Sequence, residues 1–159
     1  MKKNIAFLPL VFFIWAAFWL IPAAARHENE AKQTKKAPRL SVKAPVANIR
    51  SGPGAEYDVL WRAEKHYPFI PIGESGNWHY FKDFENDRGW IYKPLAGPAP
   101  SVIIKAEICD IRSGPGESHE SLFRVKKGVP FKVLEKKGEW IRVEHGDGDK
   151  GWVRESFVW

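Results

Sequence analysis

The chain has 159 residues, with 25 Lys and Arg against 19 Asp and Glu, and a formal net charge of +6. The basic excess falls before residue 43, since residues 43–95 carry seven basic and seven acidic groups and residues 102–159 carry eleven and ten. No clustered basic surface of the kind that binds nucleic acid is therefore expected on a folded domain, and nucleic acid is excluded as a partner. The single cysteine, Cys109, excludes an internal disulfide.

Residues 1–25 are predicted to be an export signal peptide. Lys2 and Lys3 precede an uncharged apolar run from Ile5 to Ile21, and Ala23–Ala25 then offers the small residues of a cleavage site before Arg26. The alternative is an uncleaved membrane anchor, for which a run of about 17 residues is near the lower limit. We expect an exported protein of the periplasm or cell envelope, with membrane contact only through this segment if it is retained.

Two stretches of the sequence are predicted to connect folded parts of the chain. Residues 26–39 are charged and polar without apolar periodicity, which predicts a flexible linker. Residues 96–101 are rich in Pro and Gly and predict a short, stiff connector. The predicted domains are thus residues 40–95 and residues 102–159.

These two domains repeat one pattern at an offset of 62 residues, without a gap. Asn48–Gly54, of sequence Asn-Ile-Arg-Ser-Gly-Pro-Gly, returns as Asp110–Gly116, with Asp in place of the first Asn. A duplication of this kind indicates two copies of one small folding unit. The other matched positions are mostly Gly, Pro, Trp and aliphatic residues, which build turns and cores: Leu60/Leu122, Pro68-Phe69/Pro130-Phe131, Gly76/Gly138, Trp78/Trp140 and Gly89-Trp90/Gly151-Trp152.

Each unit is predicted to be a small all-β barrel, because it has five short β-like segments separated by Gly- and Pro-containing turns. Helix is expected only as single turns near Lys93–Leu95 and Glu155–Phe157. The predicted strands are residues 46–49, 59–63, 67–72, 78–81 and 90–92 in the first unit, and 108–111, 122–125, 130–134, 140–143 and 152–153 in the second.

Strand alternation predicts which side chains face outward. If Phe81, Ile91, Val143 and Val153 point into the cores, their neighbours along the strands point away from them. These outward residues are the candidate ligand-binding residues: Trp78, Tyr80, Trp90 and Tyr92 in the first unit, and Trp140, Arg142, Trp152 and Arg154 in the second. Packing under a loop is an alternative role for the four tryptophans. The first unit is expected to be the better aromatic platform, and the second to suit a carboxylate through its arginines.

At this point the pattern resembles the bacterial SH3-like domain. The resemblance covers both units and implies a partly open barrel of five to six strands. The family occurs in exported and envelope proteins, often as a cell-wall or peptide-binding module attached to hydrolases. In eukaryotic relatives the Trp that opens the corresponding strand lies in the peptide groove, which agrees with outward-facing Trp78 and Trp140. The motifs that carry the resemblance are Asn48–Gly54, Pro68-Phe69, Gly76 with Trp78, Gly89-Trp90, and their counterparts.

The residue types that perform chemistry do not recur between the units. Cys109 is matched by Ala47, which favours a small inert residue over a catalytic thiol. Arg50 and Arg112 are expected to hold the loop after the first strand rather than a ligand, and the five histidines share no metal-ligand spacing. No cofactor, no metal and no catalytic residue is predicted.

Three classes of function follow. The leading one is a non-catalytic envelope module that recognises cell-wall peptide, peptidoglycan or a protein partner through aromatic barrel faces. The second is a structural or assembly factor that scaffolds another envelope protein. The third, a cell-wall hydrolase, is disfavoured because no Cys-His or Glu-based constellation is present.

Overall fold

The structure is a computed structural model that describes residues 38–159. The predicted signal peptide and almost all of the predicted linker lie outside the described residues. Within residues 38–159, no helix combines the length and the apolar character that crossing a membrane requires.

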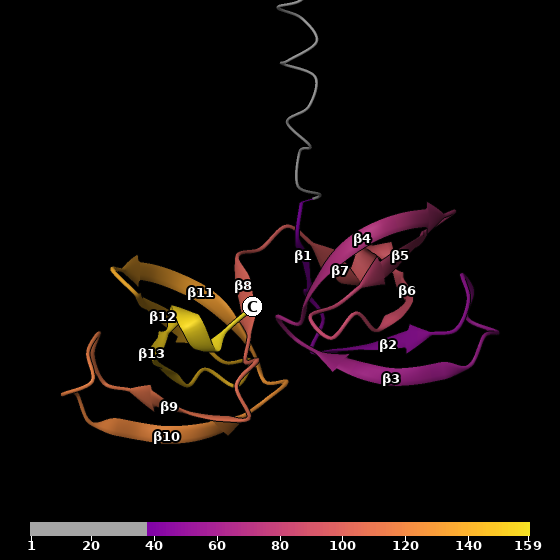
Figure 1. Cartoon of the computed structure of the whole chain (residues 1–159). Helices are drawn as coiled ribbons and strands as arrows, with labels where there is room; N and C mark the ends of the chain where they lie inside the picture. Colours follow the sequence, from indigo (N-terminus) through magenta and orange to yellow (C-terminus); the bar gives the residue numbers. More distant parts are fainter. Residues whose placement is uncertain (1–37) are drawn as a thin grey trace, which may run out of the picture. The chain divides into compact units, whose positions relative to one another are not determined.

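The first barrel is one seven-stranded antiparallel sheet in the order β3-β2-β6-β5-β4-β1-β7 (Figure 1). Its helical content is the single 3-10 turn η1, at the predicted position Lys93–Leu95. The strands are β1 (Leu40–Val42), β2 (Val46–Arg50), β3 (Val59–Glu64), β4 (Pro68–Ser75), β5 (Trp78–Lys82), β6 (Arg88–Tyr92) and β7 (Ala96–Gly97).

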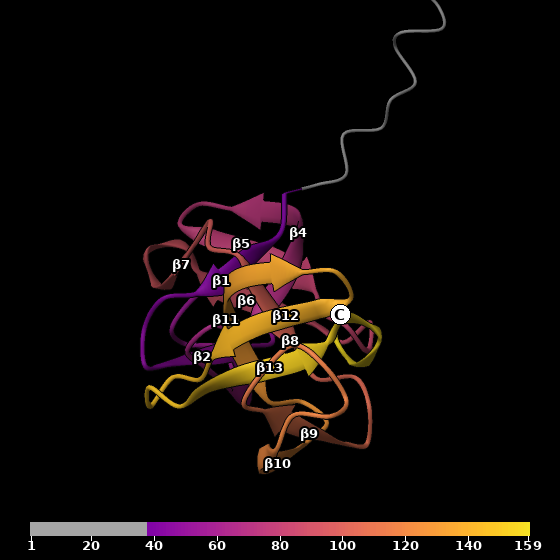
Figure 2. The same cartoon turned by 90° about the vertical axis from the view of Figure 1, so that its left-hand side faces the viewer.

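The second barrel repeats this order in six strands, β10-β9-β13-β12-β11-β8. Figure 2 shows β11, β12 and β13 side by side as a curved sheet. The 3-10 turn η2 (Glu155–Phe157) closes the barrel where the sequence predicts it. The strands are β8 (Ser101–Ile103), β9 (Ile108–Arg112), β10 (Ser121–Lys126), β11 (Pro130–Lys137), β12 (Trp140–Glu144) and β13 (Lys150–Arg154).

The duplication extends to individual residue pairs in the sheets. Val42 pairs with Ala96 in the first barrel, and at the same offset Ile104 forms a bridge with Val158 in the second. The prediction of two small all-β barrels is confirmed. Strand β1 and the short strand β7 are not among the predicted strands. Their pairing carries the first sheet two residues into the predicted connector.

Both barrels carry β-bulges at equivalent positions. Between β2 and β3 the register skips Leu60, and between β9 and β10 it skips Leu122. A bulge leaves one residue without a partner and turns its side chain away from the regular alternation. These matched leucines are therefore about half exposed, at 51% and 49%, although their recurrence suggested a core role.

The two cores reach similar packing with different residues. In the first core the fully buried Phe81 shares a cluster with Ala47 and Ala63, which face each other across β2 and β3. The second core has Val143 in place of Phe81, and the facing pair is Cys109 and Val125. A smaller residue on one strand is thus offset by larger residues on the others, as close packing requires.

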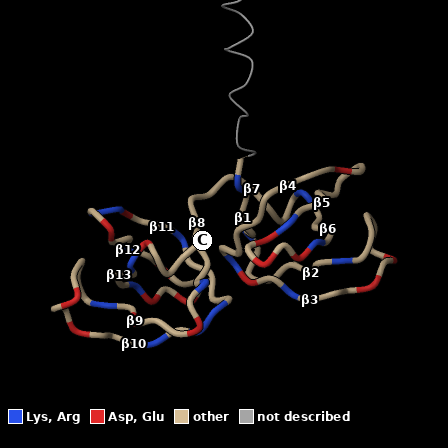
Figure 3. The backbone as a smooth tube through the Cα atoms, in the orientation of Figure 1, with Lys and Arg blue, Asp and Glu red and all other residues tan. Residues whose placement is uncertain are grey.

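Segments of Lys and Arg and segments of Asp and Glu are interspersed over the backbone of both barrels (Figure 3). This mixture matches the near-neutral charge of each repeat. A function that depends on charge therefore has to come from local arrangements of a few residues.

Candidate functional site

The four aromatic residues predicted as a platform in the first barrel do lie together on β5 and β6. Trp78 pairs directly with Tyr92, with ring centroids 5.4 Å apart, and Tyr80 pairs with Trp90 at 5.0 Å. Each pair crosses from one strand to its neighbour, the arrangement in which aromatic side chains stabilise a sheet. Tyr92 is the most exposed, at 38%, and the other three are half-buried.

The corresponding face of the second barrel is built differently. Trp140 pairs with Arg154 and Arg142 pairs with Trp152, so each cross-strand pair combines one tryptophan with one arginine. Trp152 is buried, with 9% of its surface exposed. Burial, the alternative role considered for the tryptophans, therefore applies to Trp152. Trp140 is only half-buried and lines a pocket.

A pocket lies at the same place on each barrel. The first measures about 350 Å³ and the second about 310 Å³, at the small end of the range for ligand pockets. Six lining residues of each pocket correspond at the offset of 62, whereas Tyr92 lines only the first pocket and Cys109 and Arg124 line only the second. The lining residues are Val46, Asn48, Arg50, Ala55, Trp78, Tyr92 and Leu95 in the first barrel, and Ile108, Cys109, Asp110, Arg112, Glu117, Arg124, Trp140 and Phe157 in the second.

Only part of these pockets could be predicted from strand alternation. Three predicted residues line these pockets: Trp78, Tyr92 and Trp140. The other five do not line either pocket: Tyr80, Trp90, Arg142, Trp152 and Arg154. The remaining walls come from β2 and β9, from the loops after them and from the closing 3-10 turns, with Arg124 of β10 added in the second barrel. The recurrence of Asn48–Gly54 marks this region in the sequence, but it does not show that the strand borders β6.

Arg50 and Arg112 hold the loop after the first strand, as predicted. Arg50 donates from Nη1 to the carbonyl oxygen of Tyr57 at 2.7 Å, and Arg112 donates to that of His119 at 2.8 Å. The Tyr57 ring lies against Gly52, in the space that a Cβ atom would occupy. Gly52 is thus required for a close approach, and its φ is not in the left-handed region.

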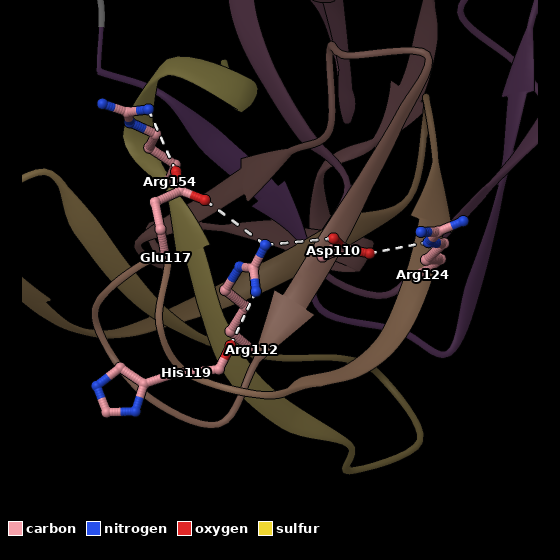
Figure 4. A network of polar contacts seen from close by, with 6 residues as sticks. All are labelled: Asp110, Arg112, Glu117, His119, Arg124 and Arg154. Carbon is pink, nitrogen blue, oxygen red and sulfur yellow. Dashed lines mark hydrogen bonds and ion pairs between the residues drawn. The ribbon is translucent and has the colours of Figure 1, made fainter.

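In the second barrel, acidic residues surround the pocket arginine (Figure 4). Nη2 of Arg112 lies 3.4 Å from Asp110 and 3.5 Å from Glu117, and Asp110 also pairs with Arg124 at 2.9 Å. The hydrogen bond from Arg124 is the main reason that the pKa of the Asp110 carboxyl is lowered, with smaller contributions from Ser121 and Arg112.

The two outward arginines of the second barrel are also paired with carboxylates of their own barrel. Arg154 lies 3.3 Å from Glu117 and 3.1 Å from Glu139, and Arg142 lies 3.6 Å from Glu135. A ligand carboxylate would have to displace these acids. Carboxylate recognition by Arg142 and Arg154 stays a prediction, in which the ligand has to compete with these exposed ion pairs.

Cys109 is buried at the wall of the second pocket, with 4% of its surface exposed. Burial, and secondarily the charge of Asp110, raises the pKa of its thiol to about 11. The thiolate is the reactive form of cysteine, so this environment suppresses reactivity at neutral pH.

We therefore expect Cys109 to react with a maleimide at pH 8 at least about a hundredfold more slowly than a free cysteine. The reason is that raising the thiol pKa by about two units lowers the fraction of reactive thiolate about a hundredfold. The measurement is mass spectrometry of the native chain over time, with the urea-unfolded chain as the control. Cys109→Ala should keep the ligand-binding behaviour of the unmodified chain. Fast labelling of the native chain would contradict the inert assignment.

Across residues 38–159, no three His, Cys, Asp or Glu side chains gather in a way that could hold a metal ion.

Comparison with known proteins identifies the repeat. A family model described as "Bacterial SH3 domain" matches residues 43–96 and 105–159. Bacillus subtilis YrvJ, whose name assigns it to the N-acetylmuramoyl-L-alanine amidases, is 26% identical over 168 residues, covering 99% of this chain and 30% of YrvJ. LytH of Staphylococcus epidermidis, named as a cell wall amidase, is 38% identical over 48 residues, covering 30% of this chain and 16% of LytH.

This chain therefore spans less than a third of the length of either relative. Among solved structures, an NlpC/P60 family protein from Bacillus cereus matches with a TM-score of 0.37 and 14% identity, covering 76% of this chain and 55% of that one.

Proposed function

The chain belongs to the bacterial SH3 domain family, and on that premise we propose that it is a non-catalytic module that binds peptidoglycan in the cell envelope through the aromatic face of its first barrel. The observation that carries this proposal is the pocket beside the Trp78–Tyr92 pair. The proposal includes export by the amino-terminal segment.

The geometry of the first barrel supports a binding role. Trp78 and Tyr92 form one wall of a hollow of about 350 Å³, and Val46 and Leu95 add apolar surface to it. Aromatic side chains offer a large contact area with little loss of conformational entropy, and they dominate binding hot spots. A sugar-peptide polymer, which has apolar sugar faces and a short peptide, is a ligand that such a surface suits.

The relatives support the choice of polymer. YrvJ and LytH are named as amidases, and LytH as a cell wall amidase. The proposal places this chain on the binding side of such a system, because its repeated residues build barrels and pockets rather than a nucleophile with a general base. A catalytic role would require a nucleophile paired with a general base, and the two pockets described above do not contain such a pair.

The test is binding of the purified chain to insoluble peptidoglycan, measured by cosedimentation over a range of polymer concentrations. Trp78→Ala is expected to weaken binding by about 2 kcal/mol, roughly thirtyfold in affinity, because it removes the larger ring of the pocket wall. Trp140→Ala is the matched variant in the second barrel, and we expect it to change affinity by less than about threefold.

Each variant needs an unfolding midpoint in urea close to that of the unmodified chain before its affinity is interpreted. Equal losses in the two variants would show that the first barrel is not the preferred platform. If both variants stay folded and sediment as before, the aromatic face is not the site, and the alternative of an assembly factor would take its place.

A further inference from the structure

The two pockets have corresponding positions in the two barrels, but they differ in the charges around the arginine that ends β2 or β9. In the second barrel, Arg112 is held between Asp110 and Glu117. At the offset of 62, these two acids are replaced by Asn48 and Ala55 in the first barrel.

The next ring of charges differs in the same way. Arg154 and its partner Glu139 in the second barrel correspond to Tyr92 and Asn77 in the first. The acids that pair with Arg112 and Arg154 are Asp110 and Glu117, both drawn in Figure 4, and Glu139, and all three correspond to uncharged residues in the first barrel.

Arg50 is left as a cation without an acidic partner. Its Nη1 donates to the Tyr57 carbonyl oxygen, and among residues 38–159 no carboxylate lies within 4.0 Å of the guanidinium. The loop between β2 and β3 has two acids, Glu56 and Asp58, and neither forms an ion pair with Arg50; Glu56 is folded against Gly54. The guanidinium has donors on its other nitrogens that the loop contact does not use.

We propose that Arg50 binds the free carboxylate at the end of a peptide whose apolar side chain packs against Trp78 and Tyr92. Arginine pairs with carboxylates through two parallel hydrogen bonds, and a charged acceptor makes these bonds stronger than neutral ones. Val46 and Leu95 leave room for a small apolar side chain next to the carboxylate.

This inference rests on the proposed function for the source of the ligand. Stem peptides of peptidoglycan can end in D-alanine, a small apolar residue with a free carboxylate. The carboxyl terminus of a protein carries the same chemistry with L stereochemistry, and the experiment separates the two sources.

The experiment is a titration of the ¹⁵N-labelled chain, followed through the indole N–H of Trp78 and the Nε–H of Arg50. The probes are N-acetyl-D-Ala-D-Ala, its carboxy-terminal amide, and N-acetyl-L-Ala-L-Ala. The D,D acid is expected to shift both signals and to bind at least about tenfold more tightly than the amide, because the amide lacks the charge that Arg50 recognises.

Variants at Ala55 test the role of charge without removing Arg50. Ala55→Glu installs the acid that neutralises Arg112 in the second barrel, and it is expected to reduce affinity for the D,D acid about tenfold or more. Ala55→Gln has nearly the same size without the charge, and it should bind like the unmodified chain. In the second barrel, Asp110→Asn combined with Glu117→Gln should create affinity for the acid that the unmodified barrel lacks.

Equal binding of acid and amide, or equal effects of Ala55→Glu and Ala55→Gln, would overturn the carboxylate site while leaving peptidoglycan binding through Trp78 intact. Another outcome is that the chain prefers the L,L acid, that Ala55→Glu reduces this affinity, and that the chain does not cosediment with peptidoglycan. This outcome would support the carboxylate site and overturn peptidoglycan as the source of its ligand. Absence of any shift with either acid would overturn the inference.

Discussion

Phe81→Ala is expected to destabilise the first barrel by about 3–5 kcal/mol, the range for removing a buried Phe from a core. Phe81 is fully buried, its ring centroid lies 4.7 Å from that of Phe69, and it meets Trp61 edge-on at 6.2 Å. The nearby Ala47 and Ala63 are too small to fill the resulting cavity. The measurement is urea denaturation followed by tryptophan fluorescence.

The second barrel supplies the matched control. Val143 occupies the position of Phe81, and Val143→Ala removes only two carbon atoms, so it should cost about 2 kcal/mol. Phe81→Val should be less destabilising when Ala63→Val is added, because that pair reproduces the residues of the second core. If adding Ala63→Val only lowers stability further, a larger residue on one strand does not make up for a smaller residue on another in these cores.

Asp83→Ala is expected to destabilise the first barrel by about 3 kcal/mol, since one substitution removes three hydrogen bonds at a buried site. Asp83 is 4% exposed. One carboxylate oxygen accepts from the Tyr67 hydroxyl at 2.6 Å, and the other accepts from the backbone N–H groups of Glu85 and Asp87, each at 2.9 Å. Burial and the contact with Asp83 raise the pKa of Tyr67, so its hydroxyl remains a donor at neutral pH. The free energy of unfolding in urea measures the loss.

A double-mutant cycle separates the two roles of Asp83. Tyr67→Phe removes the hydroxyl that Asp83→Ala would leave without its partner, so the double variant should be more stable than the sum of the single losses implies. Asp147→Ala is the control for an exposed turn, where Asp147 accepts from the N–H of Asp149 at 3.1 Å, and it should cost about 1 kcal/mol or less. Strict additivity of Tyr67→Phe and Asp83→Ala would show that the buried pair is not coupled.

These predictions separate the barrel frame from the pocket. Phe81 and Asp83 belong to the frame, and their loss should affect affinity only through unfolding. Trp78 and Ala55 border the pocket, so Trp78→Ala and Ala55→Glu should change affinity at nearly constant stability. The two repeats therefore act as built-in controls for each other, because each position of one barrel has a counterpart in the other.

The sequence alone determined the number of barrels, their all-β class and most of their strands. Gapless recurrence of Asn48–Gly54 and of Gly89-Trp90 indicates two copies of one folding unit, and short strands between Gly and Pro turns leave few architectures open. Alternation also placed Trp78, Tyr80, Trp90 and Tyr92 on one face, because side chains two apart on a strand point the same way. These are local properties, and the chain carries them before it folds.

Tertiary structure decided which of those residues border a pocket and what charge the pocket has. The walls of the first pocket come from β2, from the loop that Arg50 holds, from β5 and β6 and from the closing 3-10 turn, and their meeting depends on the order of strands in the sheet. Asp110 and Arg112 lie two residues apart on β9 and so share a face, but the contact of Arg112 with Glu117 joins a strand to a loop, which no spacing in the sequence reveals. Arg142 and Arg154 are paired with acids of their own barrel, whereas Arg50, which lines the first pocket, has no carboxylate of residues 38–159 within 4.0 Å. The sequence does not show this difference, because electrostatic pairing is set by proximity in space rather than along the chain.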